Sequence, residues 1–372
     1  MTKIVKIGAG GDEIEWQDAV KKIQRDDVLL LEPGFYEWPQ GLHVADFTIK
    51  GSGASPEDTV IYSHFTLDQD CRFFTLENLC LMTKTAHNAL YVDELADTYL
   101  TLRNVTVRGG QDDTAAIAVN GKCTIELYSC KILGASVSMF SHADFRLVVT
   151  DSLIDYPCPD YSAIGVQGHG TMVISSSTIK GSITTYQDAD CELDLDDAEV
   201  SCLLIHGQTW ANLLNSEIVE DHDAALYGSG ESWLNIVNCL VDGGVCLDQK
   251  AHALVQNTEI DRLIACDQVQ LTLNNSTVNS HADFQNTAYC DAMRVTFSGS
   301  QEFEYFLALA DQACLVGQDL VLNPNQAVLA VKDGAKIKLN VIANNDERLK
   351  VEYAKKPNVN ILGMRWNSQK PR

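Results

Sequence analysis

The sequence lacks any segment typical of a membrane-bound or secreted chain. Residues 1–10, MTKIVKIGAG, contain no apolar stretch as long as the central region of a secretory signal. No run approaches the roughly 18–20 consecutive apolar residues of a membrane-spanning helix. We therefore expect a cytoplasmic protein without membrane contact.

Metal-binding and disulfide patterns of cysteine are also missing. Twelve cysteines are scattered along the 372 residues, with no Cys-x-x-Cys pair and no Cys/His cluster at zinc spacing. Most of them fall at apolar or small-residue positions, where a free thiol behaves as a small buried hydrophobic group. The sequence thus predicts reduced, buried cysteines.

Basic residues are scarce in the middle of the chain. Residues 181–331 carry 3 basic and 23 acidic side chains, whereas residues 332–372 carry 10 basic and 4 acidic ones. The net charge is −24. Nucleic acid is excluded as a partner by this balance, because binding to it depends on neutralising phosphates with Lys and Arg. A basic protein partner is compatible with it.

Helical periodicity is confined to one place near the N-terminus. Asp12 with Glu15 three residues later forms a capping-box pattern. An amphipathic stripe follows at Trp16, Ala19, Val20 and Ile23. Elsewhere Gly and Asn interrupt short apolar segments, and 45% of the residues are hydrophobic. We expect an all-β chain with a helix over residues 12–25 that caps its first layer.

What the sequence does contain is a repeat of apolar-x-apolar-x-(Asn/Ser/Asp)-x-x-apolar. Its turn residues are spaced 18 to 26 positions apart. They are Asn78, Asn104, Ser129, Asp151, Ser176, Asp197, Asn215, Asn238, Asn257 and Asn275. The thirty slots four and two positions before and three positions after them are all apolar. Such a repeat can bury its apolar face only by stacking as a solenoid.

The turn residues and the start of the repeat carry a family resemblance. The chain resembles the right-handed parallel β-helix of the pectin-lyase-like superfamily, in which an Asn-rich turn stacks into a ladder. The segment Asp26-Asp-Val-Leu-Leu-Leu-Glu-Pro33-Gly34-Phe-Tyr36 is similar to that family's entry motif. The resemblance implies a right-handed parallel β-helix of about 13–14 coils. We divide the chain into a strand and capping helix at 1–27, the β-helix at 28–342, and a basic C-terminal cap or tail at 343–372.

Catalytic motifs of the resembling enzymes are incomplete. Gly168-His169-Gly170 and the pair Asp112-Asp113 are present, but they lie more than two coils apart. The Asn-Thr-Asp and Arg-Ile-Lys words are absent, and Thr178-Ile-Lys180 matches only in part. A glycine-flanked turn is the simpler interpretation of His169, so no catalytic residue is assigned.

Five carboxylates alternate with small or apolar residues in QDADCELDLDDAEV, residues 187–200. In a strand this places the acids outside. The candidate ligands of a Ca²⁺ ion are Asp188, Asp190, Glu192 and Asp194, since Ca²⁺ prefers carboxylate oxygens. Neighbouring carboxylates on one face are about 6.7 Å apart, too far for all to share one ion. A solvated face and a docking surface for a basic partner are the alternatives.

Two tryptophans occupy the same outward slot of adjacent repeats. Trp210 and Trp233 each lie five positions before a turn residue, a slot that Glu192 and His252 also fill. Asp194, Asn212 and Asn235 lie two residues further along. Exposed aromatic rings beside amides and carboxylates suit sugar rings. These seven residues are the predicted binding site, with burial of the tryptophans under turn loops as the alternative.

Three functions fit these observations. The first is a non-catalytic cytoplasmic binding or scaffold protein that uses the lateral face of the β-helix for a protein or glycan. No cofactor is expected, and Ca²⁺ is the one candidate. The second is a carbohydrate-active enzyme, either a polysaccharide lyase or a glycoside hydrolase. The third is an acidic mimic of nucleic acid that binds a basic protein. An oligomer is compatible with all three.

Overall fold

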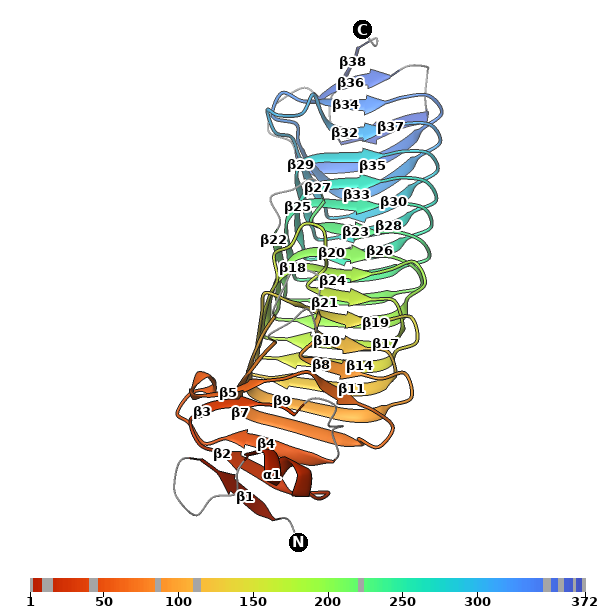
Figure 1. The fold of residues 1–372 in the computed structure, drawn as a ribbon. Helices are drawn as coiled ribbons and strands as arrows, with labels where there is room; N and C mark the ends of the chain where they lie inside the picture. The colour runs from red at the N-terminus through yellow and green to blue at the C-terminus, as the bar shows by residue number, and fades with distance from the viewer. Residues whose placement is uncertain are drawn as a thin grey trace. The chain divides into compact units, whose positions relative to one another are not determined.

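The computed structural model describes nearly the whole chain. It covers residues 3–8, 16–39, 46–83, 88–109, 115–219, 224–343, 349–353, 358–363 and 366–369. Apart from helix α1 (Trp16–Lys22) and a short 3-10 turn, η1 (Pro56–Asp58), the regular structure is strand. The protein is an all-β parallel solenoid of about 15 coils (Figure 1). The contacts between its residues group the chain into two compact units, residues 1–193 (unit 1) and 194–372 (unit 2).

Each unit is built from three parallel sheets. Sheet 1 precedes the predicted turn residue in each coil, sheet 2 follows it, and sheet 3 completes the coil. Several long strands continue from one sheet into the next, and strand β19 (Asp190–Asp196) runs across the unit boundary. Every strand pair with a resolved register is parallel, as the repeat predicts.

The strands of unit 1 are as follows. Sheet 1 holds β1 (Ile4–Ile7), β2 (Val28–Leu31), β4 (Phe47–Gly51), β7 (Phe73–Met82), β9 (Asp97–Arg108), β11 (Lys122–Tyr128), β14 (Asp144–Thr150) and β17 (His169–Ser175). Sheet 2 holds β3 (Gly34–Glu37), β5 (Thr59–Tyr62), the ends of β7 and β9, β12 (Lys131–Leu133), β15 (Leu153–Asp155) and the start of β18 (Thr178–Thr185). Sheet 3 holds β6 (Phe65–Leu67), β8 (Leu90–Val92), β10 (Ala115–Val119), β13 (Ser136–Met139), β16 (Ile164–Val166) and the end of β18.

Unit 2 repeats the arrangement. Sheet 1 holds β21 (Trp210–Leu214), β24 (Trp233–Val237), β26 (His252–Gln256), β28 (Gln270–Asn274), β30 (Tyr289–Met293), β33 (Cys314–Asn323), β35 (Lys336–Ala343) and β37 (Asn358–Leu362). Sheet 2 holds β20 (Glu199–Ile205), β22 (Glu217–Val219), β25 (Leu240–Leu247), β27 (Glu259–Ala265), β29 (Thr277–Phe284), β31 (Thr296–Ser298) and the ends of β33 and β35. Sheet 3 holds the ends of β20, β25, β27 and β29 with β23 (Leu226–Gly228), β32 (Tyr305–Leu309), β34 (Val328–Val331), β36 (Leu349–Tyr353) and β38 (Trp366–Gln369).

The predicted core is confirmed slot by slot. All thirty apolar slots of the repeat are buried, and the most accessible of them, Ala253, exposes only 6% of its surface. Burying a side chain of the size of Leu or Ile contributes about 1.5–3 kcal/mol, so this inner column supplies a large share of the stability. The twelve cysteines are free thiols, and seven of them are fully buried.

The turn residues adopt the conformation that the Asn/Ser/Asp pattern predicts. All ten have φ between 46° and 55°, the left-handed region that Asn and Asp tolerate better than most residues. Their amides bond from coil to coil in part of the ladder, as in Asn238 Nδ2 to Asn215 Oδ1 at 3.2 Å. Gly51 lies against the first of them, because a Cβ atom there would meet the Asn78 carbonyl oxygen at 2.1 Å.

Two further turn residues continue the ladder after Asn275. Arg294 and Asp319 both have φ of 56° and occupy the ladder position in the coils after Asn275. The sequence gives no Asn at the first of these, so the turn was not recognised. The structure has about 15 coils rather than the predicted 13–14 in part because the chain after residue 342 continues the stack, with β36, β37 and β38 paired in parallel with earlier strands.

The described part of the N-terminal helix is α1, Trp16–Lys22, which ends before the predicted end at residue 25. Residues 9–15, with the proposed capping pair Asp12 and Glu15, lie outside the described residues. Ala19 and Val20 are buried, and Trp16 Nε1 donates to the Glu37 carbonyl oxygen at 2.7 Å. The helix therefore packs on the first coils, while strand β1 pairs with the edge of β2.

Candidate binding surfaces

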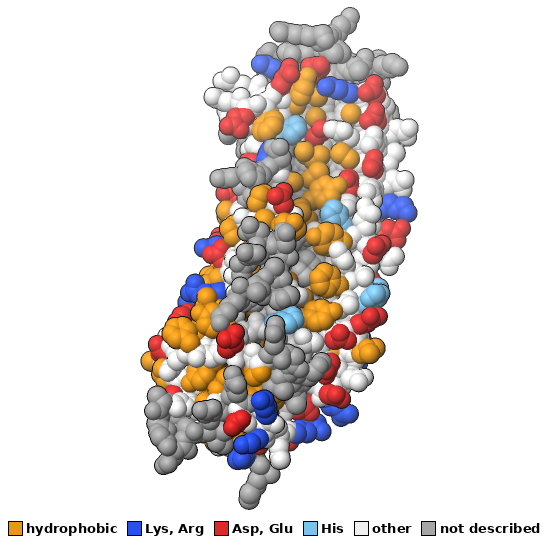
Figure 2. All heavy atoms as spheres, viewed as in Figure 1, with side chains coloured by type: hydrophobic (Ala, Val, Ile, Leu, Met, Phe, Trp, Pro, Cys, Tyr) orange, Lys and Arg blue, Asp and Glu red, His pale blue; other side chains and the backbone are white. Residues whose placement is uncertain are grey.

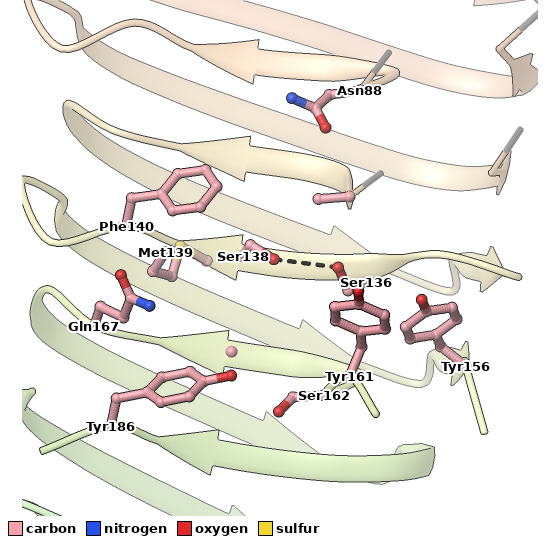
Figure 3. Close-up of a pocket in the computed structure, with 12 residues that line it drawn as sticks. Asn88, Ser136, Ser138, Met139, Phe140, Tyr156, Tyr161, Ser162, Gln167 and Tyr186 are labelled. Atoms are coloured by element: carbon pink, nitrogen blue, oxygen red, sulfur yellow. Dashed lines mark hydrogen bonds between the residues drawn. The ribbon is translucent and has the colours of Figure 1, made fainter. Parts of the chain in front are cut away.

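A hollow of about 330 Å³ lies on the outer face of sheet 3 in unit 1 (Figure 3). We call it the tyrosine hollow. Its lining residues are Asn88, Ala115, Ser136, Ser138, Met139, Phe140, Tyr156, Tyr161, Ser162, Gly165, Gln167 and Tyr186. The volume is at the lower end of the roughly 300–1,000 Å³ that is usual for ligand sites.

The hollow arises from small outward residues between bulky neighbours. Small residues are register partners on three adjacent strands: Ser138 on β13, Gly165 on β16 and Thr184 on β18. Because their side chains are short, the middle of the sheet face is recessed. Phe140 and Tyr186 directly follow β13 and β18 and rise on one side.

Tyr156 and Tyr161 form the opposite side in Figure 3. Tyr161 and Tyr186 expose 51% and 41% of their surfaces, so their rings are accessible to a ligand, whereas Tyr156 is buried at 9%. Gly165 leaves room beside Tyr186, because a Cβ atom there would lie 3.6 Å from Tyr186 Cε2.

The described lining residues of the tyrosine hollow are uncharged. Hydroxyl and amide groups supply its polarity, and Ser136 Oγ and Ser138 Oγ lie 3.1 Å apart, within hydrogen-bond distance. Among the described lining residues there is no Asp, Glu, Lys, Arg or His. The described lining residues thus offer aromatic contacts with donors and acceptors, and none of them is a carboxylate or an imidazole.

The predicted tryptophan site lies on a different sheet and in unit 2. Trp210 and Trp233 are partners in register on β21 and β24, and His252 follows on β26. Their rings stack in a column, with centroids 5.1 Å apart between the tryptophans and 4.2 Å between Trp233 and His252. Trp210 is 57% exposed and Trp233 44%, so turn loops do not bury them.

This stacking changes what the tryptophans can bind. Because Trp233 has Trp210 on one face and His252 on the other, it presents ring edges to the outside. A sugar ring needs an open aromatic face to stack on. Trp233 is therefore suited to apolar contact along its ring edge, whereas the sugar site predicted around Trp210 stays a prediction.

The flanking polar residues form an amide row beside the tryptophans. Asn212 Nδ2 donates to Asp194 Oδ1 at 2.8 Å, and Asn235 Nδ2 lies 3.5 Å from Asn212 Oδ1. The row ends at Leu254 on β26. Glu192, the remaining predicted binding residue, is an exposed side chain of unit 1.

The acidic ridge alternates as the sequence predicts. Ala189, Cys191, Leu193 and Leu195 are buried, while Asp188, Asp190 and Glu192 are exposed and Asp194 is half-buried. Within the described part of the chain, no group of three or more His, Cys, Asp and Glu side chains is placed to hold a metal ion. Asp190 Oδ2 lies 3.7 Å from His169 Nδ1. The Ca²⁺ site stays a prediction.

A separate polar cluster follows the ends of sheet 3 strands in unit 2. His206 Nδ1 lies 2.7 Å from Ser229 Oγ, and the Tyr227 hydroxyl donates a short hydrogen bond to Asp248. Burial lowers the pKa of His206. Burial, together with the bond to Asp248, raises the pKa of Tyr227 to about 12. Near neutral pH the imidazole and phenol are both uncharged.

The structure describes only part of the remaining sequence candidates. His169 is exposed at the start of β17, and Asp112-Asp113 lies outside the described residues. No described helix is both long and apolar enough to cross a bilayer. On the face shown in Figure 2, hydrophobic side chains gather along the middle, and several acidic side chains follow the right-hand edge.

No family model, curated protein or solved structure matches this chain. The fold is therefore established by its own geometry, and its function has to be argued from its surfaces.

Proposed function

We propose that this protein is a non-catalytic binding protein that holds an uncharged, hydroxyl-rich ligand, such as a neutral glycan, in the tyrosine hollow. The observation that carries the proposal is the composition of the lining, which combines accessible tyrosines with serine, asparagine and glutamine and no described charged side chain. Sugar hydroxyls pair with such groups, and the apolar faces of sugars pack on aromatic rings.

The charge of the chain supports a neutral ligand. At a net charge of −24, the protein repels polyuronates and other polyanions. The lining also argues against the carbohydrate-active enzyme, because glycoside hydrolysis generally needs two carboxylates flanking the scissile bond. The described lining supplies none.

We infer that the chain is related to the pectin-lyase-like superfamily and that its coils are right-handed. The left-handed Asn-type turn between sheets 1 and 2 supports this relation, as does the Pro33-Gly34 entry into β3. In this proposal the chain keeps the stacked coils and lacks the charged catalytic set.

A panel of neutral oligosaccharides, screened on an array and then by calorimetry, tests the proposal. Tyr186→Ala removes one wall of the hollow and is expected to weaken binding about tenfold or more, since a buried aromatic contact contributes roughly 1–3 kcal/mol. Tyr99→Ala is the matched control, because Tyr99 is exposed to the same 41% but lies on sheet 1. If no neutral glycan binds, or if both variants lose affinity equally, the proposal fails.

A further inference from the structure

The outer face of sheet 1 in unit 2 is an unusually apolar surface for exposed strands. We call the outward side chains of strands β21 to β35, together with Asp194, the sheet 1 face. Trp210, Leu214, Trp233, Leu254, Tyr289 and Met293 on it each expose between 36% and 57% of their surface. Contiguous exposed apolar side chains of this kind mark interaction sites on soluble proteins.

Charge on the sheet 1 face is confined mainly to its two ends. Asp194 lies at one end, and the exposed Lys336 and Lys338 of β35 lie at the other. Between them, the outward Asp, Glu, Lys, Arg and His side chains on the described sheet 1 strands β21 to β33 are Asp291, His252 and Asp319, the last at the left-handed turn inside β33. A neutral apolar centre with charged ends is the usual composition of a protein interface.

The register along the sheet 1 face is constant. Trp233, His252, Gln270, Tyr289, Cys314 and Lys336 are consecutive partners in one column. Asn235, Leu254, Thr272, Asp291, Val316 and Lys338 are consecutive partners in the next. An interface made from this face therefore has a definite pairing of positions.

We propose that the sheet 1 face binds a second copy of this chain in a two-fold, antiparallel dimer. The two-fold axis runs along the strand direction between β26 and β28, so that β24 of one copy faces β30 of the other. Such an axis places equal strand positions opposite each other. Trp233 then meets Tyr289 of the other copy, Val237 meets Met293, and Asp194 meets Lys338.

Charge selects this arrangement over the other two-fold packing. In that packing the two-fold axis runs along the stack of coils. The central residue of each strand would then face the same residue of the other copy. Asp194 would then face Asp194, Asp291 would face Asp291, and Lys338 would face Lys338. Like charges opposed across an interface cost several kcal/mol, whereas the antiparallel arrangement pairs opposite charges at both ends.

The size of the sheet 1 face sets the expected strength. From β21 to β35 it extends roughly 30 Å at about 4.8 Å per strand, and five residues give it a width of about 16 Å. This is below the roughly 800 Å² per partner of a standard interface, so we expect a dimer with a dissociation constant in the micromolar range.

Sedimentation velocity on the full chain, over a concentration series up to about 100 µM, tests the proposal at the strength expected for a face of this size. Lys338→Glu replaces two attractive contacts by repulsive ones and is expected to weaken the dimer about tenfold. Lys350→Glu makes the same charge change at an exposed position of β36 in sheet 3 and should leave it unchanged. The double variant Asp194→Lys/Lys338→Glu restores opposite charges and should recover most of the lost affinity.

Each result decides the matter. A concentration-dependent dimer with selective weakening by Lys338→Glu and recovery in the double variant supports the antiparallel interface. A monomer throughout the series overturns it. Equal effects of Lys338→Glu and Lys350→Glu also overturn it, because general charge would then be the cause. If Lys338→Glu alone has no effect while a dimer exists, the sheet 1 face is not the interface.

Discussion

Single residues stabilise this solenoid by satisfying backbone groups that the tight turns leave buried. Ser152 shows the principle: its hydroxyl oxygen accepts from the Cys130 N–H at 2.9 Å, and its own proton goes to the Thr150 carbonyl oxygen at 2.8 Å. Ser177, Ser216, Thr258 and Ser276 accept a backbone N–H from the neighbouring coil in the same way. These hydroxyls form a second, buried ladder one residue after the left-handed turn.

Ser152→Ala is expected to lower the free energy of unfolding by about 1–3 kcal/mol, because it leaves the Cys130 N–H buried without an acceptor. Urea denaturation followed by circular dichroism measures the change. Ser138→Ala provides the control, since Ser138 is a half-exposed serine on an outer face and should cost little. Equal losses in the two variants would count against a role for the buried ladder.

Arg294 is poorly suited to its backbone conformation. It holds φ of 56° at a ladder position without the side chain that favours it. We expect Arg294→Asn to raise the melting temperature, since Asn adopts the left-handed region at a lower cost, a difference of about 1 kcal/mol. Arg294→Ala, which removes the side chain without that preference, should be close to neutral or destabilising. A lower melting temperature for Arg294→Asn would contradict this account of the turn.

At the scale of strands, sheets 1 and 2 could be predicted from the sequence and sheet 3 could not. The slots around Asn78 to Asn275 have constant spacing because one turn residue separates sheet 1 from sheet 2. The path to sheet 3 varies in length from coil to coil, so its strands have no fixed distance from the repeat. The tyrosine hollow was missed for that reason, as it lies on sheet 3.

A second left-handed turn, between sheets 3 and 1 of unit 2, was also missed. Its residues with positive φ include Gln249, Asp267, Asn286, Asp311 and Asp333. Each is followed two positions later by a buried Ala or Val, a signal that is visible in the sequence. The predicted tryptophan column was placed correctly in register, but ring stacking depends on side-chain torsions that the repeat does not determine.

The last strands serve as the end of the stack in the described chain. β36 pairs with β34 through Val351 and Leu329, and β37 pairs with β35. Removing residues 344–372 would expose the backbone edges of β34 and β35, which invite pairing with other chains. We expect this truncation to aggregate on warming, at a temperature below the melting point of the full chain, as followed by light scattering. Removing only residues 370–372 is the control and should change neither property.

For the molecule as a whole, buried thiols couple stability to alkaline pH. Burial raises the pKa of Cys71 from its ordinary value of 9.0 to about 12, and that of the fully buried Cys290 rises well above 9.0. Below pH 9 the folded and unfolded chains both hold these protons. Above pH 9 the unfolded chain releases them while the folded chain does not, so the free energy of unfolding falls as pH rises.

Each such thiol is expected to reduce the free energy of unfolding by about 1.4 kcal/mol per pH unit between pH 9 and its folded pKa. Denaturation midpoints at pH 8, 9, 10 and 11 measure the trend. Cys290→Ala, which deletes one of these protons, should flatten the slope by that amount. A stability that stays constant from pH 9 to 11 would contradict the buried, protonated state of these cysteines.

The charge of the molecule and the chemistry of its hollow lead to one functional account, in which a neutral ligand is bound and left intact. The most direct test is to incubate the full chain with the neutral glycan that binds best and to analyse the glycan afterwards by mass spectrometry. The account predicts saturable binding with the glycan recovered at its original mass. Shorter or unsaturated products, absent when Tyr186→Ala replaces the wild type, would show that the tyrosine hollow is an active site and contradict it.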